Sequence, residues 1–274
     1  MLSMTEFLRP LAEHLTGVGG VVAVALGGSR ARGTHRPDSD YDLGLYYRGA
    51  LDVDALRKLA AEVGDEPAEV TAPGGWGPWV DGGAWLTVGG RRVDWIYRDL
   101  DRVERVWDEC RLGRYQIGFQ PGHPLGFYSH AYAGEVALGR VLADPSGALG
   151  ALAGQTRDYP PALRDALVAG LWEADFVVRA AGYGAAGADP VYAAGCLFRA
   201  AGVLCHALHG HAGRWLLNEK AMVAAAGRLD CAPPGFAARL GAALGAVGTG
   251  PEPIAASIAE VAALTAATRA AVGA

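Results

Sequence analysis

The chain has 274 residues, of which 51% are hydrophobic and 19% are charged, and its formal net charge is −5. This length suits one large domain or two small ones, and the composition is that of an ordinary globular protein. No basic block occurs, which argues against a surface that coats nucleic acid. The four cysteines form no CxxC pair, so we expect reduced thiols and a cytoplasmic location. With no run of about 18 apolar residues, we expect no membrane span.

The first part of the chain alternates strand and helix patterns. A continuous apolar run over 21–26 predicts a buried strand, and the pair Gly89-Gly90 between two apolar segments predicts a hairpin. Residues 64–82 are rich in Gly and Pro and predict a long loop. In chain order we expect a helix over 4–16, strands over 21–26 and 42–47, a helix over 52–63, strands over 84–88 and 92–97, and a helix over 100–112.

The second part is rich in Ala and follows helical spacing after an irregular stretch over 113–130. Helices are expected over about 131–142, 161–182, 189–210, 218–226, 234–247 and 253–272. The predicted fold class is therefore an α+β N-terminal domain, with a small mixed sheet and flanking helices, followed by an all-α helical bundle. We place these domains at 1–112 and 113–274.

Three aspartates carry the first chemical signal. Asp40 and Asp42 are two residues apart at the start of a strand, so both side chains lie on one face. Two carboxylates that face the same way repel unless a cation lies between them, which suits Mg²⁺. Asp94 lies within a predicted apolar strand, where an acid is costly to bury unless it is paired or bound to metal. If the two strands are neighbours, three carboxylates converge.

A Gly-Ser turn precedes this pair along the chain. The first predicted strand ends at Gly28-Ser29, where glycine allows close approach of the backbone to a phosphate. The Ser29 hydroxyl and the following N–H groups can then bind phosphate oxygens. Arg30 and Arg32 follow and can neutralise phosphate charge. The segment is not a Walker P-loop, because GxxxxGK[ST] does not occur.

Together these features carry a resemblance to a known superfamily. An apolar strand, Gly28-Ser29-Arg30-Ala31-Arg32-Gly33, then Asp40-Tyr41-Asp42 in an apolar strand and a later Asp94 resemble the DNA polymerase beta-like nucleotidyltransferases. The resemblance covers roughly residues 20–98. The wording of the Gly-Ser segment is similar to that of minimal nucleotidyltransferases and of two-domain bacterial antibiotic nucleotidyltransferases.

The resemblance implies a two-metal mechanism with ATP or another NTP as donor. Asp40 and Asp42 would hold two Mg²⁺ ions while an acceptor hydroxyl attacks the α-phosphate in line and pyrophosphate leaves. Asp94 would share the second ion or act as general base, and Glu135 is the other candidate base. Lys220 matches a helical-domain lysine that reaches the triphosphate in related antibiotic enzymes, although a surface lysine at a helix start fits equally well.

Other residues admit both a functional and a structural interpretation. Asp81 could bind the acceptor or form a turn, and Glu135 could serve the dipole of its helix instead of acting as a base. His123 could line the site or be a loop histidine with its own partners. Trp76 and Trp79 could stack on a ring or anchor the long loop.

A competing motif lies in the helical half. Arg199 and His206 are seven residues apart on one helix face and fit the R-x(4–6)-H spacing of HEPN ribonucleases, a two-residue pattern that arises easily by chance. Trp172, Phe176 and Trp215 are predicted to lie in the core of the helical part.

The favoured function is transfer of a nucleoside monophosphate, AMP from ATP, to a hydroxyl of a small molecule such as an aminoglycoside- or lincosamide-like antibiotic. The long helical part and an acidic charge that suits a cationic acceptor favour it. One alternative is a protein-modifying (AMPylating) enzyme of toxin–antitoxin type, which acts on a partner protein. The second is a non-catalytic nucleotide-binding regulator. A nucleic-acid acceptor is disfavoured by the lack of a basic patch.

Overall fold

The computed structural model describes residues 4–274, with side chains from residue 7 onward. The chain divides into two compact units. The first contains the residues up to Asp108 together with Gln116–Gly122 and Gly126–Asp158, and the second contains Glu109–Tyr115, His123–Leu125 and Tyr159–Ala274. A mixed sheet with flanking helices precedes a helical region, so the predicted fold class is confirmed.

The helices and strands predicted up to residue 112 are found, with bounds shifted by two residues or fewer. The short helix α2 directly after the first strand is an addition to them. The elements of this part of the chain are α1 (Met4–Thr16), β1 (Val21–Leu26), α2 (Gly28–Ala31), β2 (Tyr41–Tyr47), α3 (Val53–Val63), β3 (Gly83–Val88), β4 (Arg91–Asp99) and α4 (Leu100–Arg111).

The main sheet has the strand order β3-β4-β2-β1-β7. Strands β2 and β4 pair in parallel, whereas the other neighbours are antiparallel. In this register Asp42 lies opposite Asp94, and Trp85 lies opposite Asp94 on the other side. Because directly opposite residues project from the same face of a sheet, these three side chains share one face. We call it the carboxylate face.

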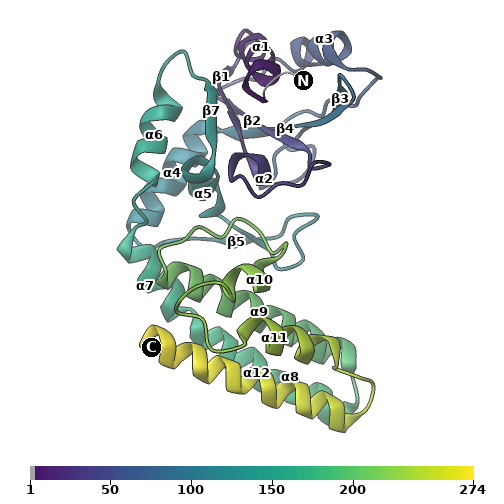
Figure 1. Cartoon of the computed structure of the whole chain (residues 1–274), viewed down its shortest axis with the longest axis vertical. Coiled ribbons are helices and arrows are strands. Elements are labelled where there is room, and N and C mark those ends of the chain that lie inside the picture. Colours follow the sequence, from purple (N-terminus) through teal and green to yellow (C-terminus); the bar gives the residue numbers. More distant parts are fainter. Residues whose placement is uncertain (1–3) are drawn as a thin grey trace. The chain divides into compact units, whose positions relative to one another are not determined.

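The opposite face of the sheet forms the core of the first unit. Alternate strand positions such as Leu45 and Trp95 are fully buried, as period-2 patterning predicts. They pack with buried residues of α1 and α3, including Leu15 and Leu56, and Figure 1 shows both helices beside the sheet. Burial of apolar surface on this face stabilises the sheet by about 25 cal/mol per Å². The carboxylate face does not supply this core, so it can contain charged side chains.

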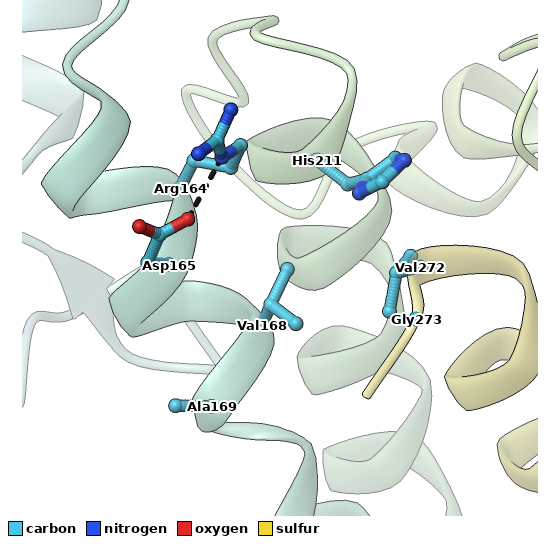
Figure 2. Close-up of a pocket in the computed structure, with 7 residues that line it drawn as sticks. All are labelled: Arg164, Asp165, Val168, Ala169, His211, Val272 and Gly273. Atoms are coloured by element: carbon cyan, nitrogen blue, oxygen red, sulfur yellow. Dashed lines mark hydrogen bonds and ion pairs between the residues drawn. The ribbon is translucent and has the colours of Figure 1, made fainter.

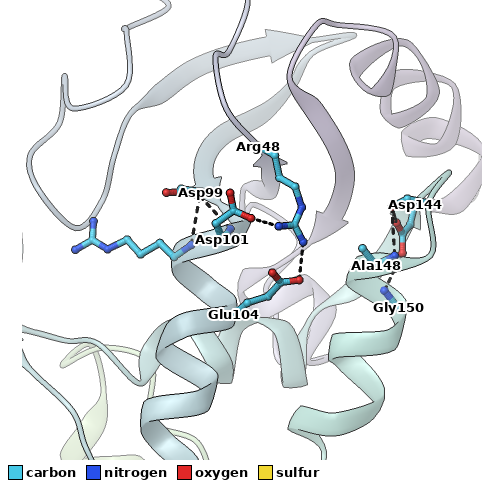
Figure 3. A network of polar contacts seen from close by, with 9 residues as sticks. Arg48, Asp99, Asp101, Glu104, Asp144, Ala148 and Gly150 are labelled. Atoms are coloured by element: carbon cyan, nitrogen blue, oxygen red, sulfur yellow. Dashed lines mark hydrogen bonds and ion pairs between the residues drawn. The ribbon is translucent and has the colours of Figure 1, made fainter.

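An ion-pair network follows the ends of β2 and β4 (Figure 3). Arg48, the residue after β2, pairs with Asp101 and, at 2.6 Å, with Glu104. Asp99 Oδ1 accepts hydrogen bonds from the first N–H groups of α4, those of Asp101 and Arg102. These contacts attach the start of α4 to the end of the parallel strand pair, and their partly exposed charges contribute little stability each.

The predicted helix over 131–142 is partly wrong. Helix α5 (Ala131–Leu138) ends before Gly139, whose backbone is extended. The chain then forms β7 (Arg140–Ala143), which pairs antiparallel with β1. Short strands β5 (Ile117–Gly118) and β6 (Phe127–Tyr128) and helix α6 (Ala148–Thr156) also lacked a prediction. Pairing of β7 with β1 depends on a partner more than a hundred positions away, which local periodicity does not report.

In the second unit, the regular elements that the structure describes are all helices. They are α7 (Pro161–Ala169), α8 (Leu171–Gly187), α9 (Pro190–His211), α10 (Met222–Ala226), α11 (Phe236–Gly245) and α12 (Pro251–Val272). The single helix predicted over 161–182 is therefore two helices, separated at Gly170. Helices α8, α9 and α12 pack against one another and run beside each other in Figure 1.

Two aromatic residues of α8 lie outside the core, contrary to prediction. Trp172 is 62% exposed and Phe176 is 57% exposed. They are four residues apart, so they project from the same side of the helix, away from the face that packs on α9 and α12. Trp215 is partly buried and contacts Tyr159, with ring centroids 4.6 Å apart.

Two of the described helices, α9 and α12, are long and apolar enough to cross a membrane by length and composition alone. Most of the apolar stretch of α9 is buried inside the unit, as in the core helix of a helical bundle, which passes the same test.

All four cysteines are free thiols, and burial raises the pKa of Cys110 to about 12.

Replacement of Leu45 by Ala tests whether the sheet core stabilises the first unit. Leu45 is fully buried, and loss of its side chain leaves a cavity, so we expect the free energy of unfolding to fall by about 2–5 kcal/mol. Urea denaturation measures the change. Leu112→Ala is the matched control, because Leu112 is 64% exposed and its truncation should change stability by less than about 0.5 kcal/mol.

Candidate functional site

The Gly-Ser turn is built against Asp42. The backbone N–H of Gly27 donates to the carbonyl oxygen of Asp42 at 2.7 Å, which extends the pairing of β1 with β2. Gly28 then takes a left-handed conformation with φ of +61°. A Cβ atom at Gly28 would lie 1.7 Å from Asp42 Oδ2. Glycine is therefore required at this position for two reasons: the backbone has a positive φ, and the Asp42 carboxylate lies where a Cβ atom would be.

Asp42 and Asp94 lie side by side on the carboxylate face. They are direct partners across the parallel strands β2 and β4, and both are partly buried. Asp40 lies two residues before Asp42, directly ahead of β2. Its Oδ1 forms an ion pair with Arg92 Nε at 2.6 Å. Arg92 is a neighbour on β4 that the sequence analysis did not single out.

The structure brings Asp42 and Asp94 to adjacent positions, with Asp40 paired to Arg92. Among the described residues, no group of three His, Cys, Asp or Glu side chains is gathered closely enough to hold a metal ion. The donor chemistry nevertheless fits a hard cation, because Mg²⁺ prefers carboxylate oxygens. Asp40 Oδ1 already has a positive charge beside it, the guanidinium of Arg92 at 2.6 Å.

The guanidinium of Arg30 is held by the loop that leads to Asp40. It donates to the carbonyl oxygens of Ser39, Asp40 and Pro37 at 2.6–3.2 Å. It also lies 3.8 Å from the centre of the Tyr41 ring, a cation–π contact. Arg30 therefore orders the approach of Asp40, and its predicted contact with phosphate stays a prediction.

The neighbouring residues of the turn are bound mainly through the backbone. The carbonyl oxygen of Ser29 accepts from the N–H of Thr34 at 3.0 Å, and Arg32 Nε donates to the carbonyl oxygen of Gly28 at 3.1 Å.

Lys220 belongs to the second unit, is exposed, and its backbone N–H donates to Asn218 Oδ1 at 2.9 Å. Its role at the triphosphate also stays a prediction.

The long loop over 64–82 is ordered by Asp81. One carboxylate oxygen accepts from the N–H of Gly74 at 2.8 Å, and the other accepts from the Tyr47 hydroxyl at 2.6 Å. Burial and this hydrogen bond raise the pKa of Tyr47. These contacts favour the turn-forming interpretation of Asp81 over a role in acceptor binding.

Gln120 fixes the same loop from a distant part of the chain. Its Oε1 accepts from the N–H groups of Trp79 and Val80, both at 2.9 Å, and its Nε2 donates to the carbonyl oxygen of Trp76 at 2.7 Å. Gln120 is only 2% exposed. The sequence analysis missed it, because a single glutamine in an irregular stretch carries no pattern that would mark it.

The two tryptophans of this loop have different surroundings. Trp79 stacks on Phe127, with ring centroids 5.6 Å apart, and its other contacts include the guanidinium of Arg102 at 4.3 Å. It is a packing anchor. Trp76 instead stacks on Trp85, with ring centroids 4.5 Å apart and an interplanar angle of 15°.

Glu135 is bound to Arg98 on the carboxylate face. Both carboxylate oxygens accept from the guanidinium, at 2.6 and 2.8 Å, and Arg98 is 5% exposed. Desolvation alone would lower the pKa of Arg98, but the charge and hydrogen bonds of Glu135 outweigh it and raise the pKa. Such a bidentate pair fixes the orientation of the carboxylate. A role for Glu135 in serving the dipole of α5 does not fit this buried pairing.

The candidates of the helical half are engaged within the second unit. His123 Nδ1 lies 3.1 Å from Glu219 Oε2. Arg199 forms a bidentate ion pair with Glu173 at 2.6 and 3.0 Å, and His206 is 4% exposed. These contacts favour a structural role for both residues, and the ribonuclease interpretation stays an untested alternative.

A pocket of about 410 Å³ lies in the second unit (Figure 2). Arg164 and Asp165 of α7 form an ion pair at 2.8 Å at its rim, and His211 and Gly273 contribute from the ends of α9 and α12. It contains none of the predicted site residues.

Comparisons with known proteins point to the first unit. Residues 6–70 match the family model described as a nucleotidyltransferase domain, which includes the Gly-Ser turn and the Asp40–Asp42 pair. The match supports a transferase with a nucleotidyltransferase domain in this unit.

Two further comparisons add no evidence about the activity of this chain. No curated protein matches the sequence. A solved structure of a nucleotidyltransferase-like protein from Exiguobacterium sibiricum 255-15 is similar over 99% of this chain and 77% of that chain, with 12% sequence identity and a TM-score of 0.49. A similarity of that size carries no argument about activity.

Replacement of Gly28 by Ala tests the close approach to Asp42. We expect a loss of stability beyond the cost of the left-handed backbone, which is about 1–2 kcal/mol, because the new methyl group displaces the Asp42 carboxylate. Gly33→Ala is the matched control, since Gly33 has a φ of +69° and open space around its Cβ position. Equal urea denaturation midpoints for the two variants would contradict the predicted contact.

Proposed function

We propose that the chain transfers a nucleoside monophosphate, AMP from ATP, to a hydroxyl group of a small molecule such as an aminoglycoside- or lincosamide-like antibiotic. The observation that carries the proposal is the register that sets Asp42 beside Asp94, with the Gly28 turn directly against Asp42. The nucleotidyltransferase match over 6–70 supports the reaction class. An acidic chain attracts a cationic acceptor, which favours the small-molecule class.

In this proposal the carboxylates of Asp40, Asp42 and Asp94 hold Mg²⁺. The cation neutralises the charge of the triphosphate and of the transition state when it is bound. Backbone N–H groups of the Gly28-Ser29 turn, which begins with Gly28 in a left-handed conformation, would bind phosphate oxygens in this proposal. Arg92, which is paired with Asp40, offers a second positive charge at the same place.

Asp94 is the preferred acceptor of the proton of the attacking hydroxyl. It lies on the side of Asp42 that faces away from the Gly28 turn, because β4 follows β2 in the sheet order. Glu135 is the weaker candidate, since both of its oxygens are bound to the guanidinium of Arg98.

One labelling experiment separates this function from its alternatives. The protein is incubated with Mg²⁺ and α-labelled NTPs, in turn with aminoglycosides, lincosamides and a cell lysate. We expect label from ATP on a small molecule. Label on a protein band would favour a protein-modifying enzyme, and nucleotide binding without any transfer would favour a non-catalytic regulator.

Replacement of Asp42 or Asp94 by Asn tests the assignment of the site. Each variant should lose at least about 10²-fold in transfer rate, because a carboxylate that binds cation or proton is lost, while the thermal unfolding midpoint changes little. Asp54→Asn is the control, since Asp54 is an exposed acid of α3 whose side chain is 82% accessible. Full activity of Asp42→Asn would refute the proposal.

A further inference from the structure

A row of functional groups crosses the carboxylate face from strand to strand. The turn at Gly27 and Gly28 follows β1, Asp42 lies on β2, Asp94 on β4 and Trp85 on the edge strand β3. Neighbouring strands are about 4.8 Å apart. The Gly28 turn and Trp85 are therefore at opposite ends of a row in which the two carboxylates lie between them.

Trp85 is unusual for its exposure. Its side chain is 67% exposed, although tryptophan is highly buried on average in folded proteins. One face of its indole is covered by Trp76, which is stacked on it at 4.5 Å. The remaining surface is open to solvent next to the position of Asp94. We call Trp85 and Trp76 the tryptophan platform.

The platform is held in place by the loop contacts already described. Gln120 Nε2 donates to the carbonyl oxygen of Trp76 at 2.7 Å. The N–H of Trp76 lies 3.4 Å from the carbonyl oxygen of Asp81, whose carboxylate is bound by Tyr47. Trp85 itself is fixed by the pairing of β3 with β4. Stacking surfaces that are fixed before binding lose little conformational entropy when a ligand arrives.

The order of the row decides which substrate the platform serves. In the proposed function the phosphates of the donor lie at the Gly28 end of the row. The platform lies at the far end, beyond Asp94, the proposed proton acceptor. A molecule stacked on Trp85 can thus present a hydroxyl group to Asp94, while the donor occupies the other side of the carboxylates.

We propose that the tryptophan platform is the acceptor subsite and that it takes a hydroxylated ring compound that carries positive charge. This inference rests on the proposed function and places its acceptor on the platform. Indole faces attract cations within about 6 Å of the ring centroid, and Asp94 and Asp42 add negative charge beside the platform. Apolar ring faces stack on the open face of Trp85, and polar hydroxyl groups remain at the rim.

Binding without transfer tests the subsite. Calorimetric titration of the whole protein with kanamycin A, a cationic aminoglycoside with ring hydroxyl groups, is compared with maltotriose, an uncharged sugar. We expect saturable binding of kanamycin A and weaker binding of maltotriose. Trp85→Ala should raise the Kd for kanamycin A about tenfold, Trp85→Phe should raise it less, and Mg²⁺–ATP should bind all three proteins alike.

The control variant is Trp172→Ala, because Trp172 is an exposed tryptophan of the second unit with 62% exposure. It should bind kanamycin A like the parent. The proposal is overturned if the parent does not bind kanamycin A, if Trp85→Ala binds it unchanged, or if Trp85→Ala loses affinity for Mg²⁺–ATP instead, which would assign the platform to the nucleobase. The titration measures binding alone, so it is independent of the transfer assay. The subsite proposal can therefore be refuted while Asp42-dependent transfer is still observed, and kanamycin A can bind at Trp85 even if no transfer occurs.

Discussion

The parallel pairing of β2 with β4 sets two carboxylates side by side, and the rest of the first unit is arranged around this constraint. Two like charges about 4 Å apart repel by about 1–4 kcal/mol, depending on the local dielectric. Asp42 and Asp94 are held together because the opposite face of the same strands is packed with residues such as Leu45 and Trp95. The position of the two carboxylates is thus imposed by apolar burial on the opposite face of the sheet.

Sequence reasoning located the four strands from β1 to β4, including the hairpin, and singled out the aspartates because these are local signals. An apolar run, a pair of glycines and a two-residue spacing between acids are visible without any tertiary contact. It also assigned Asp81 to a turn as one of two options, and the bonds from Gly74 and Tyr47 explain why that option fits.

Contacts between distant segments were not predictable in the same way. The ion pair of Arg92 with Asp40, the three hydrogen bonds of Gln120 and the pairing of β7 with β1 each join segments about 40 or more residues apart. The bonds from the Arg30 guanidinium to the carbonyl oxygens of Ser39 and Asp40 were likewise not predicted, and its contact with phosphate stays a prediction. An arginine beside a flexible turn has several possible partners, and only the folded backbone selects among them.

Strand β7 has a consequence for how the first unit can be dissected. Residues 140–143 lie beyond the four strands and four helices of the N-terminal part. They nevertheless supply the only pairing that β1 has on its outer side among the described strands. A polypeptide that stopped at residue 112 would leave the hydrogen-bonding groups of β1 open along an apolar strand. Such an edge recruits strands from other molecules, so the shortened chain would self-associate, and the Gly28 turn at the end of β1 would lose the support that fixes it.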